Sequence, residues 1–136
     1  MLAITNTDLY PGNGSGLRSN FVFGMASPEQ GVGIFSFARH RKDFEDGPLN
    51  AASSLTTEDL GSLWFKRSCQ TMVHELGHMF GLEHCVYYEC AMNGSNGSFE
   101  GDRNTNDGLC AICTTKLKMN VNFDCRERFV KLVQVY

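Results

Sequence analysis

Three short runs of β-branched and aromatic residues near the start of the chain predict strands. They cover residues 2–5, 21–23 and 32–38. Pro28 and Gly31 lie between the second and third runs, and residues of these types favour a turn. We therefore expect these two runs to form a hairpin, or at least to lie side by side in a small sheet.

We predict a loop at residues 43–54 and a helix directly after it. Thr56 or Thr57 can cap a helix whose first turn carries Glu58 and Asp59, because acidic side chains suit the positive end of the helix dipole. We expect this helix to run to about Phe80.

A further helix is predicted at the C-terminal end. Asp124 followed by Glu127 resembles a capping box. Apolar residues then recur at helical spacing: Phe129, Leu132, Val133 and Tyr136. A small twisted mixed sheet followed by helices indicates an α+β fold, and 136 residues fit a single domain.

The composition excludes several classes of protein. A content of 42 % apolar and 20 % charged residues is that of a soluble globular domain. The net charge of −3 offers no basic face for nucleic acid, and no apolar run approaches the roughly 18 residues that span a membrane. Residues 1–12 lack the basic and apolar regions of a secretory signal, so we expect an intracellular protein of the cytoplasm or nucleus.

Three N-x-S triplets, at Asn13, Asn93 and Asn96, would instead favour secretion and glycosylation. Such triplets often arise by chance in a chain rich in Asn, Gly and Ser, and they carry little weight here.

The segment HELGHMFGLEH, at positions 74–84, points most directly to chemistry. Residues four apart share a helix face, so His74 and His78 can offer their imidazoles to one metal ion. Gly81 suits a left-handed turn that ends the helix, after which His84 reaches the same ion from another direction. Three imidazoles leave the fourth position of a zinc ion open to water, as in catalytic rather than structural sites.

Glu75 follows the first histidine and is predicted to act as general base without binding the ion. A bare HExxH motif often matches by chance, but the longer form with Gly81 and His84 is far more specific. Three of the four histidines lie in this segment. The fourth, His40, is predicted to be a surface residue at a strand end.

The six cysteines admit two interpretations. The spacing Cys85-x4-Cys90 and Cys110-x2-Cys113 is typical of a structural zinc ion held by four thiolates. Two disulfides in a secreted protein are the alternative. The remaining cysteines are predicted to be inert packing residues: Cys69 and Cys125.

The two predicted metal sites are adjacent in the sequence. Cys85 directly follows His84, so an ion on the cysteines would also fix the backbone that delivers the third imidazole. Met92 comes soon after. An isolated methionine is most often a core residue, but beneath a three-histidine zinc it would form the Met-turn of metzincins.

Together these motifs are similar to those of the archaemetzincin family of zinc metallopeptidases. The resemblance lies in HELGHMFGLEHC at 74–85, CAMNGSN at 90–96 and CAIC at 110–113. It extends to the family's edge strands at residues 21–25 and 31–39. The closing helix at 125–133 is also similar.

This resemblance implies a zincin-like fold with two zinc ions per chain. One ion is catalytic, with Glu75 as base, and one is structural, on the cysteines. The domain would consist of a sheet part (1–55), an active-site helix with the third ligand (56–84), and a cysteine region with the Met-turn and C-terminal helix (85–136). The family has a further strand and a long helix before the segment that begins here, so we expect a truncated or divergent form.

The expected partner is a peptide or protein substrate that lies along an edge strand at residues 33–37. We expect the protein to be a monomer that does not associate with membranes. The alternative is a non-catalytic, zinc-stabilised interaction protein derived from a metallopeptidase. The intact Glu75 argues against that alternative, because a structural role does not need its carboxylate.

Overall fold

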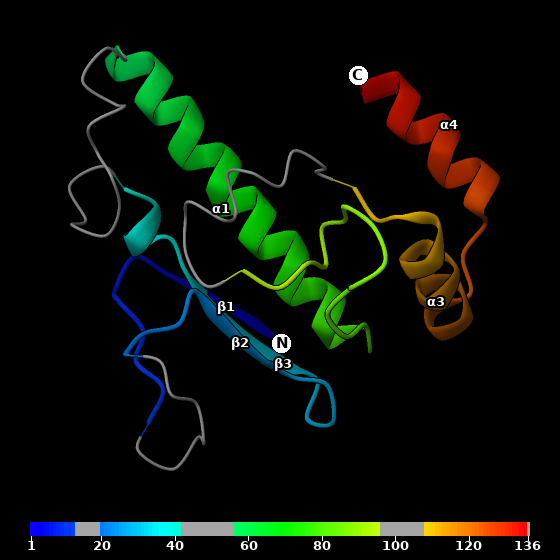
Figure 1. The fold of residues 1–136 in the computed structure, drawn as a ribbon, viewed down its shortest axis with the longest axis horizontal. Coiled ribbons are helices and arrows are strands. Elements are labelled where there is room, and N and C mark those ends of the chain that lie inside the picture. Colours follow the sequence, from blue (N-terminus) through cyan, green and yellow to red (C-terminus); the bar gives the residue numbers. More distant parts are fainter. Residues whose placement is uncertain (13–19, 42–55, 96–107, 136) are drawn as a thin grey trace.

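The described residues form a three-stranded sheet and a long helix that covers one face of the sheet, with a shorter helix near the C-terminal end of the long helix and a further short helix beyond it (Figure 1). This computed structural model describes residues 1–12, 20–41, 56–95 and 108–135. The predicted loop at 43–54 and most of the polar segment between 93 and 108 lie outside the described residues. Within them, none of the helices is both long enough and apolar enough to cross a membrane.

The sheet is mixed, as predicted. β1 (Leu2–Thr5) runs parallel to β3 (Val32–Ser36), and β2 (Gly24–Ser27) runs antiparallel to β3. The β2–β3 connection is the expected turn, in which Gly31 adopts a φ of 61° and its N–H donates to the Pro28 carbonyl at 3.2 Å. The order β1-β3-β2 makes β3 the central strand and leaves β1 and β2 as the two edges.

The second strand lies later in the chain than predicted. Residues 21–23 precede β2, and Val22 forms only an isolated bridge with Leu9. The prediction followed the aromatic and β-branched side chains, whereas register with β3 selects the weaker strand formers of the sequence GMAS. The expected substrate strand at 33–37 is also wrong, because β3 is paired on both sides.

α1 (Thr57–Met79) begins and ends where the sequence predicts. The Thr56 hydroxyl accepts the Asp59 backbone N–H at 3.2 Å, and the Asp59 carboxylate accepts the Thr56 N–H at 2.9 Å, which forms a capping box. At the other end, Gly81 adopts a φ of 80°, a left-handed conformation that other residues resist.

One face of α1 packs on the sheet. Near the start of the helix, the indole N–H of Trp64 donates to the Phe37 carbonyl at 3.3 Å. Near its end, Met79 lies so close to Gly33 of β3 that a Cβ there would stand 2.9 Å from its sulfur. Phe35, also on β3, is fully buried.

α3 (Ala111–Val121) is a helix that the sequence pattern does not predict. Its apolar and polar residues form no stripe, so the periodicity that identifies an amphipathic helix is missing. Its start is set instead by Cys110, whose sulfur accepts the Cys113 backbone N–H at 3.5 Å. Its end is set by Asn122, in the left-handed conformation at φ 51°.

α4 (Cys125–Val135) confirms the predicted C-terminal helix. The Asp124 carboxylate accepts the backbone N–H groups of Arg126 at 2.7 Å and Glu127 at 3.1 Å, as an N-cap does. The helix lies apart from the sheet, beyond α3 (Figure 1).

A largely buried ion pair ties the first segment of the chain to the turn that follows β3. Arg39 donates from Nε and from Nη2 to the two carboxylate oxygens of Asp8, both at 2.7 Å. The same guanidinium lies 3.6 Å above the ring centre of Phe21.

His40 is buried, with 6 % of its surface exposed, so the prediction of a surface residue is wrong. The short 3-10 helix η1 (Ala38–His40) turns this side chain inward. Its Nε2 lies 2.8 Å from the Thr71 hydroxyl of α1, and its ring stacks on Phe23 with the centres 5.0 Å apart.

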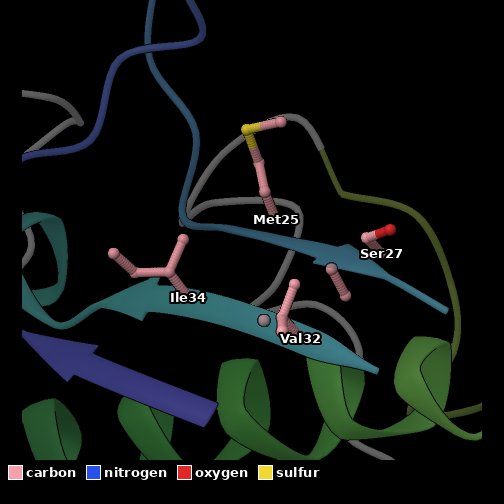
Figure 2. Close-up of a pocket in the computed structure, with 6 residues that line it drawn as sticks. Met25, Ser27, Val32 and Ile34 are labelled. Carbon is pink, nitrogen blue, oxygen red and sulfur yellow. The ribbon is translucent and has the colours of Figure 1, made fainter. Parts of the chain in front are cut away.

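The face of the sheet turned away from α1 is apolar and open. Figure 2 shows Met25 and Ser27 of β2 beside Val32 and Ile34 of β3, all pointing away from the helix. They line a shallow pocket of about 360 Å³. Met25 and Ile34 remain 41 % and 37 % exposed, so this face is partly open to solvent.

Candidate metal centre

The three predicted histidines meet at the C-terminal end of α1. His74 and His78 project from successive turns of the helix, and the turn at Gly81 brings His84 back toward them. One ring nitrogen from each lies within 4.8 Å of the others, and the ring centres are 4.7 to 5.1 Å apart.

Two backbone carbonyls decide which nitrogen of each helical histidine faces inward. Nδ1 of His74 lies 2.9 Å from the Ala91 carbonyl, and Nδ1 of His78 lies 2.7 Å from the Leu82 carbonyl. A carbonyl oxygen only accepts, so each Nδ1 carries the proton and each neutral ring presents a bare Nε2. The two Nε2 atoms face each other at 3.0 Å, an arrangement of lone pairs that suits a shared cation.

The electrostatics favour the neutral forms of His74 and His84, which are the forms that bind a metal. Burial lowers the pKa of His74 to about 4; the Ala91 hydrogen bond works in the opposite direction, and the charges of His78 and His84 lower it further. Burial also lowers the pKa of the more exposed His84. The donor set therefore fits a zinc ion with an open fourth position.

Glu75 lies beside this cluster and is only 8 % exposed. Burial raises the pKa of its carboxyl to about 7. Its side chain is confined by the edge strand, because a Cβ on Gly24 would stand 2.6 Å from its Cγ and Cδ. A buried carboxyl with a pKa near neutrality has the protonation behaviour expected of a general base.

Met92 packs against α1 at Gly77 and is fully buried. Its thioether fills the space next to Gly77, where any Cβ would overlap the sulfur. Gly77 directly precedes His78 on α1, so Met92 supports the helix turn that carries that ring. The assignment of Met92 as a Met-turn residue stays a prediction.

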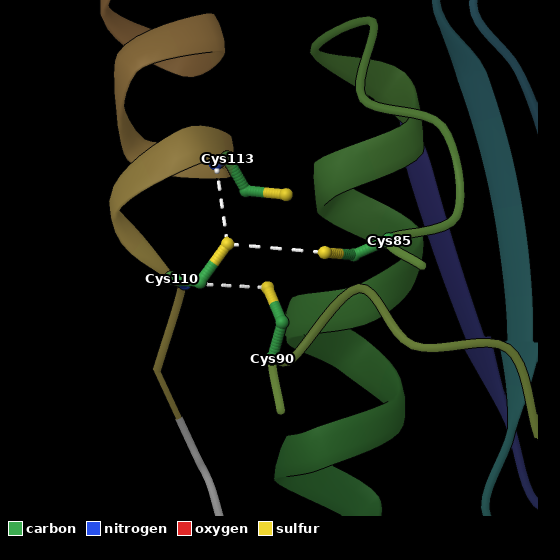
Figure 3. Close-up of side chains that lie close together, drawn as sticks. All are labelled: Cys85, Cys90, Cys110 and Cys113. Carbon is green, nitrogen blue, oxygen red and sulfur yellow. Dashed lines mark hydrogen bonds between the residues drawn. The ribbon is translucent and has the colours of Figure 1, made fainter. Parts of the chain in front are cut away.

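The four predicted cysteines form a second cluster next to the first. Cys85 and Cys90 come from the loop after the histidines, and Cys110 and Cys113 come from the start of α3 (Figure 3). Their sulfurs lie within 4.8 Å of one another, and those of Cys85 and Cys110 are 3.8 Å apart. Four sulfurs around one zinc at about 2.3 Å would be separated by about 3.8 Å, so the cluster fits a structural zinc ion.

The surroundings of the sulfurs also favour a cation rather than disulfides. Backbone N–H groups of Met92 and Cys110 point at the Cys90 sulfur, at 3.5 and 3.3 Å. Burial and then the neighbouring thiols raise the pKa of Cys113, so the four groups do not all ionise without a compensating charge. No disulfide joins any of the six cysteines in this structure, which fits the metal interpretation better than the disulfide alternative.

Comparison with known proteins assigns the family. Residues 48–119, more than half of the chain, match the model of peptidase family M54. The chain belongs to peptidase family M54, the archaemetzincins. Over 149 aligned positions it is 40 % identical to archaemetzincin-2 of Homo sapiens, and it is 36 % identical over 118 positions to the archaemetzincin of Pyrococcus furiosus.

Solved archaemetzincin structures share the fold. The archaemetzincin of Methanopyrus kandleri is 33 % identical, with a TM-score of 0.66 over 90 % of this chain. A zinc-dependent peptidase from Methanocorpusculum labreanum is 31 % identical, with a TM-score of 0.64 over 85 % of it. These matches confirm the predicted zincin-like α+β fold.

This M54 chain spans only part of its relatives. It covers 40 % of human archaemetzincin-2, 53 % of the Pyrococcus furiosus protein and 56 % of the Methanopyrus kandleri chain.

Sequence reasoning missed several groups that shape this archaemetzincin site. The Ala91 and Leu82 carbonyls orient two histidines, and backbone groups leave no trace in side-chain motifs. Gly24 confines Glu75 across the sheet, and only the register of β2 shows this.

Proposed function

We propose that this chain is a zinc-dependent peptidase whose catalytic zinc is held by His74, His78 and His84, with Glu75 as general base. A second, structural zinc would be held by Cys85, Cys90, Cys110 and Cys113. The proposal depends chiefly on one observation: two bare Nε2 atoms face each other at 3.0 Å beside a buried carboxyl.

Glu75 would move the proton that peptide hydrolysis requires. Its carboxylate accepts a proton from the attacking water and then donates it to the amine nitrogen that leaves when the peptide bond breaks. The raised pKa of about 7 lets the group do both near neutral pH. When bound, zinc supplies the remaining chemistry by polarising the scissile carbonyl and lowering the pKa of water.

The outer edge of β2, with which no described strand pairs, is the place where we expect the substrate to bind. The Ser36 N–H donates to the Phe23 carbonyl at 2.8 Å, and paired residues alternate along an antiparallel ladder. Gly24 and Ala26 therefore turn their N–H and C=O groups toward the open edge. A peptide paired there as an added strand would pass next to Glu75, since that carboxyl lies against Gly24.

The test is hydrolysis of a model peptide by the wild-type chain and by Glu75→Ala, with zinc per chain measured in both. We expect two zinc ions in each protein and loss of hydrolysis in the variant. Equal rates would exclude Glu75 as the base. Two zinc ions with no hydrolysis by the wild-type chain would favour the zinc-stabilised interaction protein.

A further inference from the structure

The two candidate metal sites share one loop, which runs from His84 to Gly94. It contacts each member of the histidine cluster: His84 lies in it, the Ala91 carbonyl orients His74, and Met92 packs against the turn before His78. Gly94 lies flat against the His84 ring, where a Cβ would stand 3.2 Å from Nδ1.

The same loop supplies two of the four cysteines. Cys85 and Cys90 are buried within it, and their sulfurs join those of α3. No helix or strand is assigned between Leu82 and Ser95, so the backbone polar groups of this loop need other partners.

The side chain of Asn93 supplies three of those partners. Its Nδ2 donates to the carbonyls of Cys85 at 2.8 Å and Tyr88 at 2.9 Å. Its Oδ1 accepts the backbone N–H of Cys90 at 2.7 Å. Both amide hydrogens and one lone pair of the oxygen are thus used inside one loop.

These bonds tie Asn93 to the backbone of both loop cysteines and, through its neighbours, to the histidines. The Asn93 N–H donates to the Cys90 carbonyl at 2.9 Å, and the Cys85 N–H donates to the Met92 carbonyl at 2.8 Å. Residues 91 to 94, which orient His74, support α1 and abut His84, therefore move with the Asn93 amide.

We propose that Asn93 is a positioning residue that couples the two clusters. A metal ion bound by the cysteines would then raise the affinity of the histidine cluster for its own metal ion. This inference rests on the proposed function in taking the histidine cluster as a zinc site. An ion on the cysteines fixes the backbone of Cys85 and Cys90. The hydrogen bonds of Asn93 to that backbone then restrain Ala91, Met92 and His84 as well. Coupling of this kind is reciprocal, so the histidine ion also steadies the cysteine cluster.

Few side chains can replace Asn93, because the position needs two hydrogen-bond donors and one acceptor. Asn93→Asp keeps an acceptor for the Cys90 N–H but puts an oxygen, often charged, against the carbonyls of Cys85 and Tyr88. Asn93→Ala removes all three side-chain bonds. The same bonds occupy the amide that a glycan would need, so they argue against use of the Asn93 triplet as a glycosylation site.

Cobalt(II) titration of the metal-free chain tests the coupling. Sulfur-to-cobalt charge transfer reports the cysteine cluster, and the visible bands of nitrogen-bound cobalt report the histidine cluster. The affinity of the histidine cluster is measured with the cysteine cluster intact and with it removed by Cys110→Ser plus Cys113→Ser. The ratio of these two affinities is the coupling, measured in the wild type, Asn93→Ala, Asn93→Asp and the control Thr115→Ala.

In the wild type we expect the intact cysteine cluster to tighten the histidine cluster by about 10-fold to 100-fold, as indirect supports of metal ligands do. Both Asn93 variants should bring this ratio below about 3-fold, and Thr115→Ala, which loses only a bond to Ala111 within α3, should leave it as in the wild type. An unchanged ratio in both Asn93 variants would overturn the role of Asn93, and a wild-type ratio near one would overturn the coupling itself; neither result would touch the proposed function. If the wild-type histidine cluster binds no cobalt, the proposed function fails as well.

Hydrogen exchange of the wild-type chain gives a second measurement that needs no variant. Filling the histidine cluster alone should slow exchange of the Cys90 and Cys85 amides, because Asn93 and Met92 hold their N–H groups. Exchange that does not respond to the histidine ion would contradict the proposal, even if the Asn93 variants fail to fold.

Discussion

Gly24 of β2 and Glu75 of α1 are in direct contact, and the absence of a side chain at Gly24 creates the space that the Glu75 carboxyl occupies. A Cβ at this position would stand 2.6 Å from Cδ and 2.8 Å from Oε1. The free edge of the sheet and the proposed base therefore meet at one point. Any change at that point moves the base relative to a peptide bound along β2.

Replacing Gly24 by alanine should impair catalysis without removing an ion. The added methyl group displaces the Glu75 carboxyl, and a misplacement of about 1 Å can cost about 100-fold in rate. We expect kcat of Gly24→Ala on a model peptide to fall by about 10-fold to 100-fold, with two zinc ions per chain retained.

Gly61→Ala is the matched control. Gly61 lies in α1, and a Cβ added to it would meet no other atom within 4 Å, so alanine fits there and favours the helix. It should raise the free energy of unfolding by about 0.5–1 kcal/mol and leave kcat unchanged. A similar kcat for both variants would show that the Gly24 contact does not position Glu75.

The stability of the chain with an empty histidine cluster should depend on pH through Glu75. Its pKa is raised from 4.5 to about 7, so between these pH values the unfolded chain has lost a proton that the folded chain keeps. The free energy of unfolding therefore falls as pH rises through this range, by on the order of 3 kcal/mol from this group. His74, with its pKa lowered from 6.5 to about 4, acts in the opposite direction between these two pH values and so offsets much of the Glu75 effect in the total.

Glu75→Gln isolates this effect, since the amide does not titrate and His74 is common to both proteins. In urea unfolding with a chelator present, the free energy of unfolding of the variant should rise relative to that of the wild type as pH increases from 4.5 to 7. A difference between the two proteins that stays constant over that range would mean that the carboxyl is not desolvated as the structure indicates.

Loss of a single ligand should remove one ion and leave the other. His84→Ala takes away the imidazole that lies outside α1, and two remaining nitrogens hold zinc poorly. Elemental analysis after dialysis should therefore give about one zinc per chain for this variant and about two for the wild type. Two ions retained in His84→Ala would remove His84 from the ligand set.

The ion pair between Arg39 and Asp8 should be a major local contribution to stability. Their side chains are only 9 % and 12 % exposed, so Arg39→Met would remove the cation that balances the Asp8 carboxylate and leave it only the Leu9 N–H and the Tyr10 side chain as hydrogen-bond partners. We expect a cost of about 3–5 kcal/mol in urea unfolding. The double variant Asp8→Asn plus Arg39→Met should recover much of it, and equal costs for the two proteins would contradict this account.

The sequence predicted the elements whose signals are local. Thr56 and Asp59 mark the start of α1 by their own hydrogen bonds, and Gly81 marks its end by a conformation open to glycine. The spacing of His74, His78 and His84 on that helix and turn is enough to bring them together. Local geometry thus made the candidate site predictable before the fold was known.

The features that the sequence did not predict depend on tertiary partners. β2 is a strand because β3 pairs with it, and its own residues have weak strand propensity. α3 begins at a cysteine rather than at a usual capping residue and has no apolar stripe. His40 is buried because η1 and α1 enclose it, which a lone histidine at a strand end does not reveal.

The position of β2 has a practical consequence for measurements on the chain. An edge that accepts a peptide by backbone pairing also accepts the same edge of another molecule, and the apolar face beside it, with Met25 and Ile34, strengthens such pairing. At high protein concentration the molecules would then compete with their own substrate. Specific activity should therefore be compared across dilutions before a low rate is attributed to the catalytic residues.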